Sequence, residues 1–255
     1  MKTRILVVIV SAFIAASCGQ RGDDKGVVSA NNDSIKRSTI GKIIKTTNSG
    51  LTEDSVMNHI AITRKMFEHF RELIKGGKQR EALDYYFKNK VDIAIALETS
   101  EKIYRFDNEI IIPLIYSQCD STEAFQKIVQ IHEFDKFYIE ALMIMEGDKS
   151  SVPDIYLRTL ADLSFAYLST NENSKALETS AKMLELLEKN QGRVSLDYAN
   201  SLFNHASIQI ECKLYKEANA SLLEAKKIYE KLKMAGTEEY SNTLRRIKEG
   251  SKRIV

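Results

Sequence analysis

Apolar residues recur at helical spacing through most of the chain beyond residue 51. The first stripe advances in steps of four, seven, three and four residues, and its members are Val56, Ile60, Phe67, Phe70 and Ile74. Such spacing places the side chains on one face of an α-helix. Gly76 and Gly77 follow, and glycine commonly ends a helix. The pattern therefore predicts a helix that begins near Thr52 and ends at these two glycines.

The same periodicity predicts further helices over residues 82–97, 111–116 and 124–145. Asp107 and Asn108 are predicted to form a turn between two of them, and residues 146–151 to form a break. Strand-like alternation is rare, and proline occurs only at positions 113 and 153. The chain is therefore expected to be all-α.

A repeat of 42 residues runs through the last hundred positions. The matching pairs are Tyr156 with Tyr198, Leu160 with Leu202, Ser164 with Ala206, Leu168 with Ile210, and Ala176 with Ala218. Ala82 and Ala124, each preceded by Glu, are also 42 residues apart. An offset held across a helix, a turn and the next helix indicates a stacked array of helical hairpins.

The repeat resembles the tetratricopeptide family, most clearly in residues 197–232 and more loosely in residues 155–190. Ala206 and Ala218 match the small residues where the two helices of a repeat cross, and Leu202, Tyr215 and Leu222 match the large ones. The period is similar to the kinesin-light-chain variety of 42 residues rather than to the common form of 34. Glu188 and Glu230 stand where the family usually has proline, and Asn173 and Ser180 also depart from its pattern. The resemblance, weak over residues 56–134, implies a helical-hairpin solenoid over residues 51–255.

The first eighteen residues have the pattern of an exported protein. Lys2 and Arg4 precede an uncharged, mostly apolar run over residues 5–16, which is too short to span a bilayer and typical of a signal peptide. Residues 15–18, Ala-Ala-Ser-Cys, resemble the bacterial lipobox, although that motif usually has Leu where Ala15 stands. The resemblance implies that residues 1–17 are removed and that Cys18 is acylated. A plain signal peptide with an incidental cysteine is the other interpretation.

Residues 18–50 are predicted to be a flexible tether between the lipid and the helical domain. Residues 19–50 contain five Gly, many small polar residues and no aromatic residue. A stretch of this composition cannot bury enough apolar surface to offset the entropy lost on ordering.

The charge balance argues against nucleic-acid binding. The chain has 37 Lys and Arg against 35 Asp and Glu, and removal of residues 1–17 would leave 35 of each. A nucleic-acid-binding domain normally has a basic face. If Cys18 carries lipid, Cys119 and Cys212 remain, and both lie in apolar helical patterns that favour free thiols over a disulfide.

No motif for catalysis is present. The four histidines, His59, His69, His132 and His205, do not have the spacing of metal ligands, and there is no glycine-rich phosphate loop or nucleophile elbow. We therefore predict a protein without enzymatic activity, cofactor or metal.

The tetratricopeptide resemblance implies a groove lined by the first helix of each repeat. In the first clear repeat the groove residues would be Arg158, Asp162, Phe165 and Ser169. In the second they would be Asn200, Phe203, Asn204, Ser207 and Glu211. Asn204 matches a family asparagine whose amide holds the backbone of an extended peptide. The ordinary alternative is that these are solvent-exposed helix residues.

These observations predict a lipid-anchored repeat protein of the bacterial cell envelope, on the outer membrane or a periplasmic face, that binds a protein or peptide. A permanent subunit of an envelope complex, of the barrel-assembly or pilus-biogenesis type, is the alternative. A polar groove would favour the reversible binder, and a large exposed apolar patch would favour the permanent subunit.

Overall fold

The computed structural model describes residues 52–97, 99–145 and 152–251, and within these ranges it contains helices and no strand. The described residues fall into two compact units. The first holds those up to Asp120 and those from Phe137 to Met145, and the second holds residues 121–136 and 152–251. The predicted signal peptide, Cys18, the tether and the predicted break at 146–151 lie outside the described residues.

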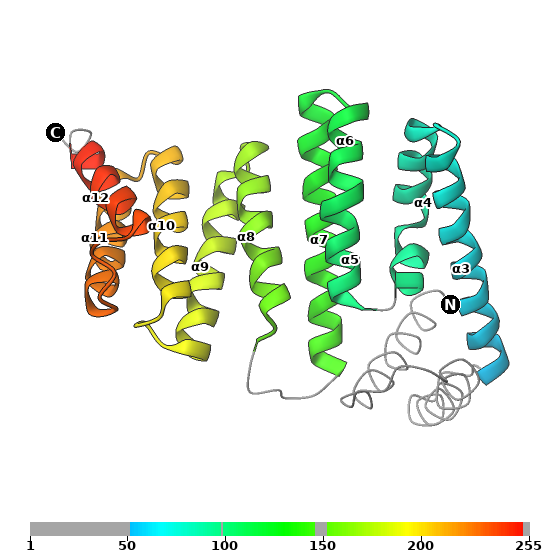
Figure 1. Ribbon diagram of the computed structural model, residues 1–255, viewed down its shortest axis with the longest axis horizontal. Helices are drawn as coiled ribbons and strands as arrows, with labels where there is room; N and C mark the ends of the chain where they lie inside the picture. Colours follow the sequence, from blue (N-terminus) through cyan, green and yellow to red (C-terminus); the bar gives the residue numbers. More distant parts are fainter. Residues whose placement is uncertain (1–51, 98, 146–151, 252–255) are drawn as a thin grey trace. The chain divides into compact units, whose positions relative to one another are not determined.

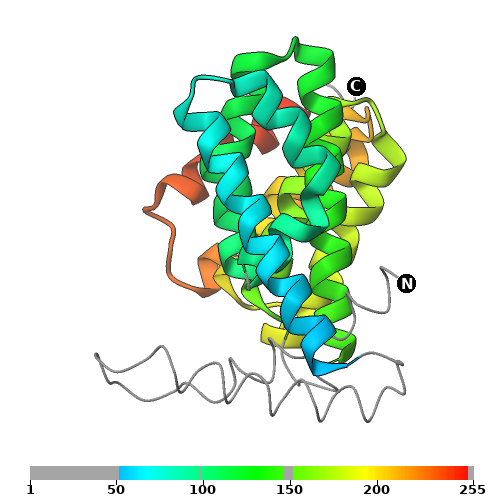
Figure 2. The ribbon, with the colours of Figure 1, turned by 90° about the vertical axis from the view of Figure 1, so that its right-hand side faces the viewer.

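The first unit begins with a hairpin of α3 (Glu53–Lys75) and α4 (Gln79–Leu97), which lie side by side in Figures 1 and 2. Thr52 caps α3, accepting a hydrogen bond from the Ser55 amide at 3.1 Å. Gly77 has a φ of 73°, and the next amide, that of Lys78, donates to the Leu73 carbonyl at 2.9 Å. This is the left-handed glycine turn that closes a helix, so the predicted helix and its end are confirmed.

The predicted turn at Asp107 and Asn108 is wrong. The chain continues there from α5 (Ser100–Phe106) through a π-helical turn, η1 (Asp107–Ile111), into α6 (Ile112–Gln118). Pro113 near the start of α6 has no N–H to donate, and a π turn just before it relaxes the usual hydrogen-bond pattern.

The Asp107 side chain is buried and holds this turn against α4. It accepts a hydrogen bond from the Tyr86 hydroxyl and lies 3.5 Å from Nζ of Lys90, which is itself buried. Phe106, one residue earlier, packs edge-on against Phe67 and Phe70 of α3. The polar residue that suggested a turn is therefore an internal partner for a lysine.

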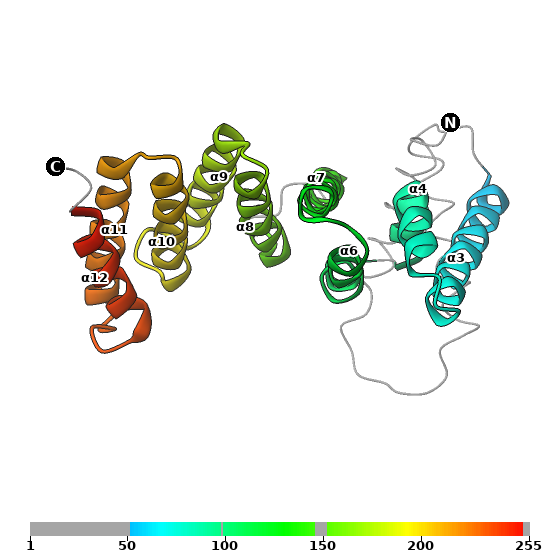
Figure 3. The same cartoon turned by 90° about the horizontal axis from the view of Figure 1, so that it is seen from above.

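Helix α7 (Ser121–Met145) contributes residues 121–136 to the second unit. The rest of that unit is two hairpins and a final helix. They are α8 (Asp154–Ser169) with α9 (Asn173–Gln191), α10 (Leu196–Glu211) with α11 (Tyr215–Lys231), and α12 (Glu238–Ser251). Figure 3 shows the hairpins in end view, side by side, with α12 against α11.

The 42-residue register is confirmed by the backbone. Helices α8 and α10 begin 42 residues apart (196 − 154), as do α9 and α11 (215 − 173). Asn171 and Lys213, again 42 residues apart, both take left-handed conformations, with φ of 61° and 64°, in the turns that close α8 and α10. Ala176 and Ala218 follow these turns by five residues, and both are buried. Each hairpin is thus built on the same turn and the same small contact residue.

Helix α12 continues the 42-residue register, and this third copy was not predicted from the sequence. It begins 42 residues after α10 (238 − 196) and places Tyr240 and Leu244 in line with Tyr198 and Leu202. However, Lys248 stands where α10 has the small residue Ala206. Ile247 packs against the apolar cluster of α10 and α11, so α12 covers that hairpin with an otherwise charged helix.

Replacing either alanine at the turns with leucine should disturb the hairpin crossings. We expect Ala176→Leu and Ala218→Leu each to lower the free energy of unfolding by about 1–3 kcal/mol, because a larger side chain must displace the facing helix. Urea melts followed by circular dichroism measure the loss. Ala220→Leu, at an exposed position of α11, is the control and should change little. Unchanged midpoints for both buried positions would contradict the crossing assigned to them.

Candidate functional site

A pocket of about 270 Å³ opens on the second unit between α8, α9 and α10. Its apolar lining comes from Leu157, Ala161, Met183 and Leu187, three of which are buried side chains. Its polar lining consists of Asp154, Arg158, Asp197, Asn200, Ser201 and Asn204. Because the 42-residue repeat places α8 and α10 in equivalent positions, both first helices present polar groups to one depression.

Three of the predicted groove residues meet in this pocket. Arg158 comes from α8, and Asn200 and Asn204 come from successive turns of α10. Arg158 and Asn200 are equivalent positions of the two repeats, 42 residues apart. The tetratricopeptide resemblance therefore pointed to three positions that the fold brings to one place.

The other predicted positions do not line the pocket. Phe165 and Ser169 are exposed, and Asp162 is half-buried. Phe203 packs against the apolar cluster between α10 and α11, so its ring is a contact of the hairpin core. Ser207 donates its hydroxyl hydrogen to the Phe203 carbonyl at 3.0 Å, and Glu211 is exposed at the end of α10.

The pocket residues outside that set were not predicted from the sequence. Met183 and Leu187 belong to α9, the second helix of its hairpin, and the resemblance pointed only to first helices. Asp154 and Asp197 lie in the first turns of α8 and α10, where a carboxylate is also favoured by the helix dipole. The apolar spacing of α9 could have indicated Met183 and Leu187 as buried, though not that they also line a pocket.

Asn200 is held in a fixed orientation. Its side-chain oxygen accepts a hydrogen bond from the Tyr229 hydroxyl of α11 at 2.7 Å. Burial, followed by the nearby charge of Glu239, raises the pKa of Tyr229 to about 12, so the phenol keeps the hydrogen that it donates. The Asn200 amide hydrogens are then the groups left to meet a ligand.

The side chains of Arg158 and Asn204 make no hydrogen bond or ion pair within the part of the chain that the structure describes. Asp197 accepts a hydrogen bond from the Gln191 side chain at 3.1 Å, which fixes one carboxylate at the rim. The pocket thus combines an apolar base with a guanidinium, carboxylates and an amide. These groups suit the carbonyl, amide and charged groups of a peptide.

His205 lies on α10 and contacts α9. Its Nδ1 is 2.8 Å from the Ser180 hydroxyl oxygen, and that hydroxyl donates its hydrogen to the Leu177 carbonyl at 3.0 Å. The tautomer of the imidazole determines which of the two atoms, Nδ1 or the hydroxyl oxygen, donates in this hydrogen bond. Burial lowers the pKa of His205 below its ordinary value of 6.5, because the charged imidazolium is poorly solvated there.

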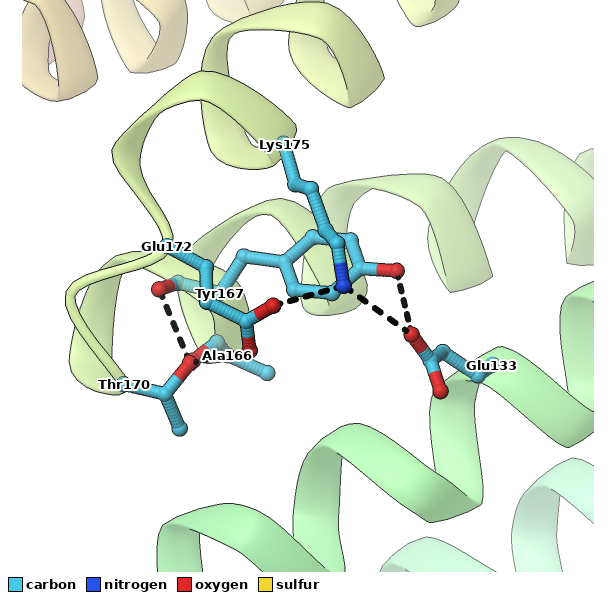
Figure 4. Close-up of polar contacts among 6 residues, drawn as sticks. All are labelled: Glu133, Ala166, Tyr167, Thr170, Glu172 and Lys175. Atoms are coloured by element: carbon cyan, nitrogen blue, oxygen red, sulfur yellow. Dashed lines mark hydrogen bonds and ion pairs between the residues drawn. The ribbon is translucent and has the colours of Figure 1, made fainter.

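A polar network joins α7 to the turn between α8 and α9 (Figure 4). The Tyr167 hydroxyl donates to Glu133 of α7 at 2.7 Å, and Nζ of Lys175 lies 5.0 Å from the centre of the Tyr167 ring. Lys175 also lies 2.6 Å from Glu172, which accepts a hydrogen bond from Thr170 at 2.9 Å. The bond from Lys175, and then that from Thr170, lowers the pKa of Glu172. Each group is engaged within the protein, so the network serves to hold the turn.

The described residues contain no group of three or more His, Cys, Asp or Glu side chains placed to hold a metal ion. Cys119 and Cys212 form no disulfide within the described residues. Among the described helices, none is long and apolar enough to cross a membrane.

Comparisons with known proteins add little beyond the fold. No protein-family model matches the chain, and no curated protein matches it. Among solved structures, it is similar to the crystal structure of BtubC (BKLC) from P. vanneervenii, with 15% identity and a TM-score of 0.44. The match covers 77% of this chain and 71% of that chain. A likeness this distant carries no functional argument, and the assignment of helical hairpins rests on the elements described above.

The buried His205 makes stability depend on pH. The folded protein binds a proton at this residue less readily than the unfolded chain, so its stability should fall as the pH drops below about 6.5. His205→Asn offers Ser180 an amide that can donate or accept, and it cannot titrate. Urea melts at about pH 7.5 and about pH 5.5 should show a smaller loss for this variant than for the wild type. His69→Asn, at an exposed histidine, is the control, and an equal loss in all three proteins would contradict the role of His205.

Proposed function

We propose that this chain is a peptide-binding helical-repeat protein without enzymatic activity, and that the pocket of α8, α9 and α10 holds a segment of a partner protein. The observation that carries the proposal is the set of hydrogen-bonding groups over an apolar base, contributed by two consecutive first helices. A peptide needs both, since an apolar side chain supplies contact area and its backbone needs donors and acceptors.

Each group has a specific role in this proposal. An apolar side chain of the ligand rests on Leu157, Met183 and Leu187. The Asn204 amide pairs with a peptide group, because it can donate and accept at once. Arg158 meets a carbonyl or carboxylate, while Asn200, held by Tyr229, donates its amide hydrogens.

The polar rim supports reversible binding over permanent assembly. A permanent subunit interface is large and apolar, whereas this pocket has six polar and four apolar residues in its lining. We retain a subunit of an envelope complex as the second candidate, since the described surface also includes exposed apolar side chains such as Leu223 and Val194.

The sequence of the first eighteen residues supports a membrane location within the same proposal. Acylation of Cys18 would attach the chain to a membrane of the bacterial envelope, and residues 18–50 would give the helical units reach. The partner would then be a protein of the same compartment.

The binding prediction concerns Asn204 and Arg158. Photo-crosslinking from position 196, which is exposed one turn before Asn200 and outside the pocket lining, identifies the partner in intact membranes, and its affinity for purified wild-type protein is then measured. Asn204→Ala with Arg158→Ala should weaken binding by about 1–3 kcal/mol for each lost pairing, because partner groups are left desolvated and unpaired. Asn242→Ala, at the α12 position equivalent to Arg158 and Asn200 and outside the pocket lining, is the control. If the double variant binds as tightly as the wild type, the pocket is not the binding site.

The anchor prediction concerns Cys18. Cys18→Ala should prevent incorporation of labelled fatty acid, leave the longer precursor uncleaved, and lower the yield of correctly processed protein in the membrane fraction. Stable anchoring needs more than one acyl chain, at about 0.8 kcal/mol per buried methylene. If the variant is still cleaved before position 18 and remains as firmly membrane-bound as the wild type, the lipoprotein assignment fails and a plain signal peptide is favoured.

A further inference from the structure

A second hollow, of about 580 Å³, lies along the exposed face of α11 beside the loop that joins α9 to α10. Its lining shares no residue with the pocket of α8, α9 and α10. The residues that line it are Arg193, Val194, Ala220, Leu223, Glu224, Lys227, Ile228 and Lys231. The α11 members recur at steps of three, one, three, one and three, so they form one stripe along the helix.

The stripe is more apolar than a solvated helix face requires. Leu223 is 40% exposed and Val194 on the adjoining loop is 50% exposed, while Ile228, which also lines the hollow, is buried. Exposed apolar side chains scattered singly are ordinary, but these line one concave surface.

The sister repeat shows that the fold does not need an apolar residue here. The residues of α9 that correspond to Ala220, Leu223 and Lys227 of α11, 42 positions earlier, are Glu178, Ala181 and Glu185. All three are exposed, as their counterparts are. Since α9 forms the same hairpin with charged and small residues at these positions, Leu223 and Lys227 are not explained by packing of the repeat.

The hollow is also basic. Its lining carries three cations and one anion, Glu224. Arg193 is engaged by Glu188 at 2.9 Å and by Glu224 at 3.8 Å. Lys227 and Lys231 are exposed and form no ion pair with any described residue. Two lysines without ion pairs on one helix face repel each other, and an anionic partner would relieve that repulsion.

From this juxtaposition we infer that the α11 hollow is a docking site for an acidic segment of a partner protein, one that inserts a large apolar side chain against Leu223 and Val194 and places carboxylates on Lys227 and Lys231. Charge complementarity selects the occupant. The chain's own residues 19–50 carry six Lys and Arg against three Asp, so that segment is of the wrong sign to fill the site. The inference is independent of the function proposed for the other pocket.

The test uses a short fluorescein-labelled peptide rich in Glu with Leu and Phe, and the same peptide with Lys in place of Glu. Fluorescence anisotropy should show that the full chain binds the acidic peptide and not the basic one, with affinity that falls as salt is raised. Leu223→Ala with Lys227→Glu copies the sister repeat, so it should fold normally. It should weaken binding by roughly tenfold or more, because like charges then face each other across the interface.

Lys65→Glu on the exposed surface of α3, in the first unit, makes the same change in net charge outside the lining of the hollow, and it should bind the peptide as the wild type does. Circular dichroism melts confirm that each variant is folded. The inference is overturned if the wild type fails to bind the acidic peptide, or if the double variant binds it equally well.

Two other occupants give different results, and either would also overturn the inference. If the same substitutions abolish adsorption to vesicles containing phosphatidylglycerol while the peptide does not bind, the surface meets lipid. If they abolish concentration-dependent dimerisation seen by sedimentation, and the peptide does not bind, the surface meets a second copy of this chain.

Discussion

The close crossing of two helices at a buried alanine is the contact on which the second unit depends. Ala176 and Ala218 lie one turn into the second helix of their hairpins and have almost no exposed surface. Without a larger side chain there, the helices approach until Leu222 and Ala206 share one apolar cluster. Each crossing depends on the tight turn before it. Asn171 in one turn and Lys213 in the other take left-handed backbone conformations that non-glycine residues seldom adopt.

The pocket of α8, α9 and α10 is a consequence of this spacing. Because the two hairpins repeat in the same register, α8 and α10 present equivalent turns side by side, and α9 lies between them in the chain. Side chains such as Leu157 and Met183 therefore serve both the core and the base of the pocket. Differences between the repeats then decide its chemistry. Where one repeat has Arg158 and Leu187, the next has Asn200 and Tyr229, which bond to each other.

Polar side chains with distant partners stabilise the packing inside each described unit, in addition to its apolar contacts. In the first unit, Asp107 accepts from Tyr86 and meets Lys90 where a π turn interrupts the helix. In the second, the buried Tyr167 donates its hydroxyl hydrogen to Glu133 of α7, and Lys175 lies over the Tyr167 ring, which ties α7 to the turn after α8. The charges of Asp107 and Lys90 are costly to bury alone, so each depends on the other, a partner distant in the sequence.

Periodicity alone was sufficient to predict the all-α fold, the first helix with its glycine turn, and the 42-residue register, because each depends on residues close together or on an exact spacing. Arg158, Asn200 and Asn204 were assigned to one groove by the tetratricopeptide resemblance, and the fold brings them to one pocket. The π turn at Asp107 was not predicted, because it depends on Lys90 and Tyr86 of another helix.

Phe203 was assigned to the groove because of the face of α10 on which its position in the repeat places it. Only the packed structure shows that this face meets the cluster covered by Ile247 of α12. The α11 hollow was also invisible to the pattern, since it requires a loop residue, Val194, to lie beside a helix that follows it by more than twenty residues. Sequence spacing determines which face of a helix a residue occupies, and only tertiary structure decides what that face meets.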